Sequence, residues 1–335
     1  MSFFYYRIIS IFSKAWNKEG LSMIWMIFVS LFFLVIPAQV KADATQISGG
    51  LDSRALSEAP LWGVGEETLN LHGAFVNLRH VISDEKGDRY IFVAQMDAND
   101  NLSEFEAYQV YAQLKGSLGG ANLRVGRYIL PFGLLAYLDT ERQLIQTQES
   151  IALGIKLDTG IQVSGFAGAL DYALSVSQGT GMPDDEDSNK LLVARIGLQQ
   201  EENRWGLSYL DGRINSDEDI FYPQGNSDKQ RLAIDAELDL LPWMLRIQLD
   251  AGKDDGRSVS GATLLADYDV NARLSFNSKI SYWDSTDEFQ EMVIGLSYLL
   301  PNNFVFRLAE TWQQINDIDD TIFAVQLYWD FSHAL

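Results

Sequence analysis

The residues that could carry catalytic chemistry are few. The chain has no cysteine and only three histidines, His72, His80 and His333, and none of these lies in a recognisable nucleophile motif. A hydrolase with a serine–histidine or aspartate–histidine site needs a histidine beside the serine or the aspartate. The absence of cysteine excludes thiolate catalysis, thiolate zinc sites and covalent haem attachment. We therefore predict a protein that is not an enzyme, with no catalytic residue, no metal and no cofactor.

One acidic run has the spacing of a cation site. Asp235, Glu237 and Asp239 occupy alternate positions, so on a strand they lie on one face, successively about 7 Å apart. Carboxylates at that spacing could suit Ca²⁺. A polar strand face in contact with water has the same pattern, and we prefer this second interpretation.

The overall charge excludes one large class of partner. Asp and Glu outnumber Lys and Arg by 46 to 25, which gives a net charge of -21. A nucleic-acid-binding protein needs a basic face to displace counterions from phosphates. We therefore predict no nucleic-acid partner.

The acidic run belongs to a strand pattern that recurs along the chain. From Arg231 to Leu240, charged residues and Ala233 alternate with the apolar side chains of Leu232, Ile234, Ala236 and Leu238. Ser275 and Phe276 fall on opposite faces of a similar segment. Sixteen such segments run from 68–80 to 319–335, with 150–158 among them. The fold class predicted is all-β, a transmembrane antiparallel β-barrel of about 16 strands, within a range of about 14 to 18.

A soluble β-sandwich is the alternative to a membrane barrel. The predicted strands are about nine to thirteen residues long, which is the length a tilted strand needs to cross hydrocarbon, whereas sandwich strands are shorter. Short turns also tend to alternate with long polar connections, and aromatic residues cluster near strand ends. Both features are typical of outer-membrane barrels.

The N-terminal segment has the composition of an export signal. Arg7, Lys14 and Lys18 precede an apolar run over 23–36, and small residues before position 43 fit cleavage after Ala42. A retained anchor is the alternative, but the run is shorter than the ~20 residues that span a bilayer. We predict a signal peptide over 1–42, a periplasmic N-terminal arm over 43–67 and the barrel over 68–335.

The C-terminus and one internal motif resemble known families. Phe323, Leu327 and Phe331 lie on an apolar face that ends at Leu335, which resembles the closing-strand signal read by the barrel-assembly machinery of Gram-negative outer membranes. Residues 126–133 match a G-x-x-x-x-P-F-G element through Gly126, Pro131, Phe132 and Gly133. Over about 105–181 the chain resembles the phosphate-selective porin O and P family. That resemblance implies a sixteen-stranded porin, usually trimeric, with loops folded into the channel.

Residues 131–150 form a long connection after this motif. They mix apolar and charged residues, so the connection is either an external loop packed on its barrel or a loop that narrows the pore. In the second case the constriction and pore wall are formed by loop residues Asp139, Glu141, Arg142 and Glu149 with strand residues Arg124, Arg195, Arg231, Asp235 and Glu237. The predicted wall charges balance and the connections are acidic, so we expect weak cation selectivity and not phosphate selectivity.

These features predict a porin-like channel in the outer membrane of a Gram-negative bacterium, for passive diffusion of small hydrophilic solutes or ions. The expected partners are outer-membrane lipid, lipopolysaccharide and the barrel-assembly machinery. A homotrimer and a periplasmic partner protein stay open. The alternative function is a sheath for a partner such as a multihaem cytochrome in an electron conduit.

Overall fold

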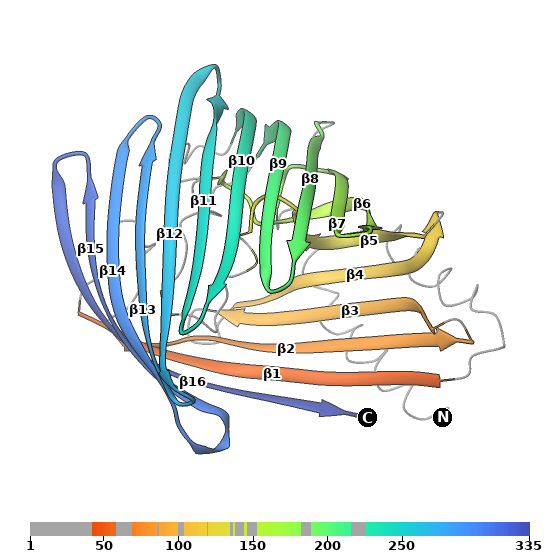
Figure 1. Ribbon diagram of the computed structural model, residues 1–335, viewed down its shortest axis with the longest axis horizontal. Helices are drawn as coiled ribbons and strands as arrows, with labels where there is room; N and C mark the ends of the chain where they lie inside the picture. The colour runs from red at the N-terminus through yellow and green to blue at the C-terminus, as the bar shows by residue number, and fades with distance from the viewer. Residues whose placement is uncertain are drawn as a thin grey trace. The chain divides into compact units, whose positions relative to one another are not determined.

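The protein folds as a closed antiparallel β-barrel (Figure 1). A computed structural model describes residues 42–57, 69–85, 87–99, 104–118, 120–134, 137, 144–145, 153–181, 189–215 and 226–335. Each strand pairs with its neighbours in the chain, and β16 closes the barrel against β1. The predicted all-β barrel of sixteen antiparallel strands is confirmed.

The strands contain between 8 and 17 residues. In chain order they are β1 (Ala42–Leu56), β2 (Leu69–Asp84), β3 (Gly87–Asn99), β4 (Glu104–Leu118), β5 (Ala121–Ile129), β6 (Leu157–Ala167), β7 (Leu170–Ser177), β8 (Leu191–Gln200), β9 (Asn203–Ile214), β10 (Ser227–Leu240), β11 (Trp243–Asp254), β12 (Arg257–Asn271), β13 (Leu274–Asp284), β14 (Glu288–Leu299), β15 (Phe304–Ile315) and β16 (Ile318–Ala334). A short 3-10 helix, η2 (Pro301–Asn303), precedes β15. Strands of this length, tilted as in known barrels, can cross an apolar layer about 25 Å thick.

Two faces alternate along each strand, as β10 shows. Arg231 and Asp235 are buried toward the lumen, whereas Leu232 and Ile234 are 50% and 59% exposed. The register places Asp235 opposite Gln248 and Ile234 opposite Leu249 on β11, so both strands present the same kinds of residue to the same faces. The polar face of this barrel is therefore the inner one, as the alternation predicts.

The outer face is apolar and carries aromatic residues toward the strand ends. Large exposed side chains include Leu207, Phe276 and Ile294. Trp243 and Tyr268 have ring centroids 4.7 Å apart, and those of Phe304 and Trp329 are 6.2 Å apart. Within the described residues, no helix is long and apolar enough to cross a membrane.

The two ends of the barrel differ in their connections. Turns such as 201–202 and 241–242 join strands at one end, where Ala42 and Leu335 also lie. The four longest connections between strands, 57–68, 130–156, 178–190 and 215–226, all join strands at the other end. The predicted asymmetry between short turns and long connections is present, although the turns after β11 and β15 at that second end are short.

Two predicted boundaries are wrong, and their errors cancel in the strand count. Residues 43–56 of the predicted arm belong to β1. On its outward face Ile47 and Leu51 alternate with the small or polar residues Thr45, Gly49 and Ser53, which weakens the apolar signal. The predicted strand over 150–158 does not form, because β6 begins at Leu157. The apolar side chains of Leu153 and Ile155 are buried in the connection instead. The predicted signal peptide, apart from Ala42, lies outside the described residues.

Candidate functional site in the barrel lumen

The connection between β5 and β6 enters the barrel directly after the G-x-x-x-x-P-F-G motif. Leu130, Pro131, Phe132 and Gly133 are all buried. Gly133 has φ of +64°, and a Cβ at this position would collide with the side chain of Gln248 on β11. Glycine is needed here both for the left-handed backbone and for the close approach to the opposing strand.

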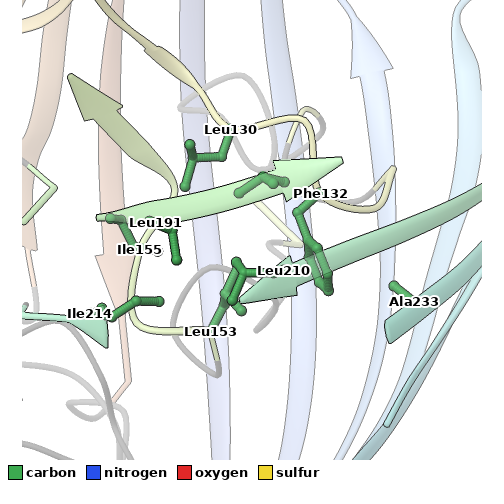
Figure 2. Packing of buried hydrophobic residues seen from close by; sticks show 9 residues of the cluster. Leu130, Phe132, Leu153, Ile155, Leu191, Leu210, Ile214 and Ala233 are labelled. Carbon is green, nitrogen blue, oxygen red and sulfur yellow. The ribbon is translucent and has the colours of Figure 1, made fainter. Parts of the chain in front are cut away.

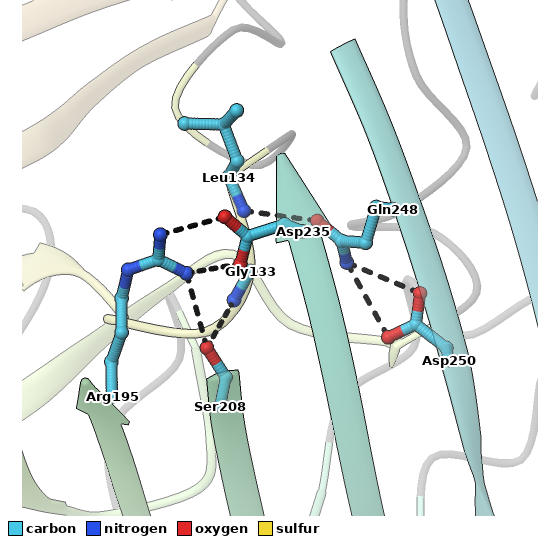
Figure 3. A network of polar contacts seen from close by, with 7 residues as sticks. All are labelled: Gly133, Leu134, Arg195, Ser208, Asp235, Gln248 and Asp250. Carbon is cyan, nitrogen blue, oxygen red and sulfur yellow. Dashed lines mark hydrogen bonds and ion pairs between the residues drawn. The ribbon is translucent and has the colours of Figure 1, made fainter. Parts of the chain in front are cut away.

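Two side chains of the wall hold the backbone of this connection. The amide of Gly133 donates to Ser208 Oγ on β9 at 3.0 Å, and the amide of Leu134 donates to Gln248 Oε1 at 2.9 Å (Figure 3). Both bonds are buried, where loss of a partner costs more than in water. They fix the first residues of the connection against β9 and β11.

One ion pair and further hydrogen bonds hold these two wall side chains. The guanidinium of Arg195 on β8 binds the carboxylate of Asp235 on β10 through both terminal nitrogens, with 2.7 Å between Nη2 and Oδ1. Arg195 also donates to Ser208 Oγ at 3.2 Å, and Gln248 donates to Asp250 at 3.2 Å (Figure 3). The bidentate pair is a strong and directional contact.

An apolar cluster also attaches the connection between β5 and β6 to the barrel wall. Its members are buried and come from both the connection and the inner faces of β8, β9 and β10 (Figure 2): Leu130, Phe132, Leu153, Ile155, Leu191, Val193, Leu210, Ile214 and Ala233. Inward apolar residues are unusual in a lumen that holds water. Here the connection covers them, so this part of the lumen is filled by protein.

The same connection also contacts a distant part of the wall. Ile145 packs with Val293 on β14 and Ala309 on β15, and Leu144 packs against this cluster. Val293 and Ala309 lie on the inner faces of their strands, as the burial of alternate residues shows. Residues 130–134 thus contact β8 to β11, and residues 144–145 contact β14 and β15. The connection is inside the barrel at both places.

The predicted wall residues all lie on inner faces, but they do not form one cluster. Arg195 and Asp235 bind each other, Arg231 binds Asp254 at 2.6 Å, and Glu237 binds Arg246 at 2.7 Å. Arg124 on β5 lies apart from these pairs. The predicted loop residues Asp139, Glu141, Arg142 and Glu149 lie outside the described residues.

Each carboxylate of the acidic run at 235–239 is bound to another group of the protein. Asp235 is bound to Arg195 and Glu237 to Arg246, and the carboxylate of Asp239 accepts the amide of Leu241 at 3.3 Å. Groups of three acidic or histidine side chains able to hold a metal are absent from the described residues. The acidic residues therefore bind other groups of the barrel wall.

Sequence reasoning did not identify Ser208 and Gln248 as residues of this site. Ser208 and Gln248 are neutral residues in regular strands, and nothing in their spacing marks them as contacts of a segment about 75 and 114 residues away. Their role comes from barrel closure, which brings β9 and β11 around the residues that follow β5.

Comparison with known proteins gives a structural likeness only. No protein-family model matches the chain, and no curated protein matches its sequence. A loop-deletion mutant of OmpT, an outer membrane protein of Vibrio cholerae, has a TM-score of 0.68 at 8% identity, over 87% of this chain and 100% of that one. The anion-selective porin from Comamonas acidovorans has a TM-score of 0.61 at 11% identity, over 88% and 99%. A mutant of the Rh. blastica porin has a TM-score of 0.57 at 13% identity, over 87% and 100%. The chain therefore shares the fold of Gram-negative outer-membrane porins.

Proposed function

We propose that the protein is an outer-membrane channel for passive diffusion of small hydrophilic solutes. The observation that carries this proposal is the connection between β5 and β6, which lies inside a closed barrel whose inner face is polar and whose outer face is apolar. A barrel with an apolar exterior suits a bilayer, and an inserted segment sets the size of the passage.

The inserted segment favours a channel over a sheath. Side chains of the segment pack on β8 to β10 and on β14 to β15, in the space that a threaded partner would occupy. A sheath for a multihaem cytochrome would require this segment to leave its buried contacts. Haem staining of the preparation purified from its host membrane would detect such a partner.

The proposal also includes a family assignment and a set of partners. The resemblance to the phosphate-selective porin O and P family is carried by the motif at Gly126 to Gly133, which leads the chain into the lumen. A homotrimer is supported by a similar structure described as a trimer form of OmpT. Lipopolysaccharide, outer-membrane lipid and the barrel-assembly machinery are the partners that this location requires.

Liposome swelling tests the proposal. Vesicles containing the purified protein should swell in small sugars and progressively less in larger ones, because the inserted segment restricts the passage. Vesicles containing heat-denatured protein provide the control. Swelling no faster than this control would contradict the proposal.

A further inference from the structure

The charges of the inner wall are mostly neutralised by one another. Ion pairs within the wall include Lys229 with Asp254 at 3.2 Å, Arg246 with Asp267 at 2.6 Å, and Lys279 with Glu291. Paired charges contribute little net field to a passage. The solute therefore meets chiefly the groups that have no ion-pair partner.

Arg124 on β5 is such a group. In the described part of the chain, no carboxylate lies within ion-pair distance of it. Its Nε and Nη2 donate to Gln113 Oε1 at 3.1 and 2.9 Å. Its guanidinium lies 4.4 Å from the ring centroid of Tyr111 and 5.7 Å from that of Tyr128. The half-buried side chain is thus fixed on the wall while keeping its full charge.

The orientation of Arg124 leaves one edge of its guanidinium for a ligand. The glutamine occupies the edge formed by Nε and Nη2, and Nη1 donates to no described residue. The remaining edge, formed by Nη1 and Nη2, presents two parallel N–H groups. This geometry matches the two oxygens of a carboxylate.

Tyr137 of the inserted segment adds a second donor nearby. Its phenol interacts electrostatically with Arg124, Arg195 and Arg204 and with the carboxylate of Asp171. The residue as a whole is 41% exposed. Asp235 neutralises Arg195, and Arg124 is the charged group with the largest effect on the phenol.

We propose that Arg124 and Tyr137 form a subsite for the carboxylate of small monovalent organic anions, an inference that rests on the proposed channel function. A single positive charge balances a monoanion. The free edge of one guanidinium matches the two oxygens of a carboxylate, whereas the second charge of a phosphate dianion would have no partner on that edge. The subsite thus favours carboxylates such as propionate over phosphate.

The test measures binding and conduction on the same preparations of the full chain. Saturation-transfer NMR reports propionate binding to the protein in detergent, and bilayer recordings report the block of KCl current by propionate at constant ionic strength. The variants are Arg124→Gln and Tyr137→Phe. Arg307→Gln is the matched control, because Arg307 is also an inward arginine without an ion pair among the described residues, bonded to Gln326 at 2.7 Å.

We expect propionate to bind the unmodified protein and Arg307→Gln alike, and to bind Arg124→Gln about tenfold more weakly, because a charged bidentate contact is lost. The effect of Tyr137→Phe should be smaller. Should Arg124→Gln fail to assemble, Arg124→Lys keeps the charge but loses the fork and should still weaken binding.

Equal binding by the Arg124 variants, or stronger competition by phosphate than by propionate, would overturn the subsite. Failure of the channel function is a separate outcome. If binding depends on Arg124 and no preparation conducts, the subsite stands and the channel does not.

Discussion

The amide of Leu134 donates a 2.9 Å hydrogen bond to the side chain of Gln248, which lies 114 residues further along the chain. This bond joins the segment after β5 to the inner face of β11. With the bond from Gly133 to Ser208, it holds the entry of the segment against the wall. The position of the segment inside the barrel therefore depends on neutral side chains of the wall.

Replacing Gln248 with Leu should loosen the segment. The Leu134 amide would lose its buried acceptor, at a cost of about 1 to 3 kcal/mol. We expect a larger and noisier single-channel conductance, with the barrel still assembled. Gln313→Leu is the control, because Gln313 bonds to Glu291 on the wall at 3.1 Å. Identical recordings from the two variants would mean that the Leu134 bond does not set the passage.

Breaking the pair between Arg195 and Asp235 should destabilise the barrel. Removing one partner leaves a buried charge uncompensated, which costs about 3 to 5 kcal/mol. We expect Asp235→Ala to lower the free energy of unfolding in urea by that order. The double variant Arg195→Met with Asp235→Leu should recover much of the loss. A double variant less stable than Asp235→Ala would argue that the pair contributes more than mutual neutralisation.

Charge on the outer face should impair assembly. Ile234→Asp places a carboxylate at position 234, where the isoleucine side chain is 59% exposed among apolar neighbours. A charge on the lipid-facing side of a barrel costs on the order of 2 kcal/mol near the bilayer midplane. Ser275→Asp places it on the inner face. The folded fraction, measured by heat-modifiable migration in SDS, should fall for the first variant alone. Equal losses in both would show that the assignment of faces does not govern insertion.

Glu310 is an acid on this outer face. It is exposed on β15, and the register places it between Ile294 on β14 and Phe323 on β16. A lipid-facing carboxylate is unfavourable, so Glu310→Leu should raise the stability of the folded monomer by about 1 kcal/mol. Ile294→Leu controls for a change of apolar shape. Destabilisation by Glu310→Leu would indicate that the carboxylate binds a partner in the membrane.

The sequence predicts the existence of the barrel far better than the bounds of its strands. The alternation over ten residues in β10 is easy to recognise, because each residue type indicates its face. One face meets an apolar phase and the other meets polar groups. β1 escapes this reading because Gly49 and Ser53 lie outward and its pairing with β16 is made at the opposite end of the chain. The buried apolar residues around Leu153 and Ile155 resemble a strand, because inner packing also requires apolar side chains.

The site is only partly predictable for a similar reason. The motif at Gly126 to Gly133 marks where the chain leaves β5. The partners of individual charges are set by neighbouring strands, as for Arg231, which binds Asp254 on the next strand. In the sequence the wall charges balance, so the acidic connections alone lead to the prediction of weak cation selectivity. The pairing leaves Arg124 as an uncompensated wall charge, which argues for anion binding at that point.

Single-channel recording in planar bilayers tests the central claim most directly. Purified, detergent-extracted protein should insert in discrete steps of uniform conductance, and the steps should widen in Gln248→Leu because the inserted segment is less firmly held. Stepwise current that changes in this way is the result the proposed channel predicts. Absence of current above the detergent control, from protein that migrates as a folded barrel, would contradict it.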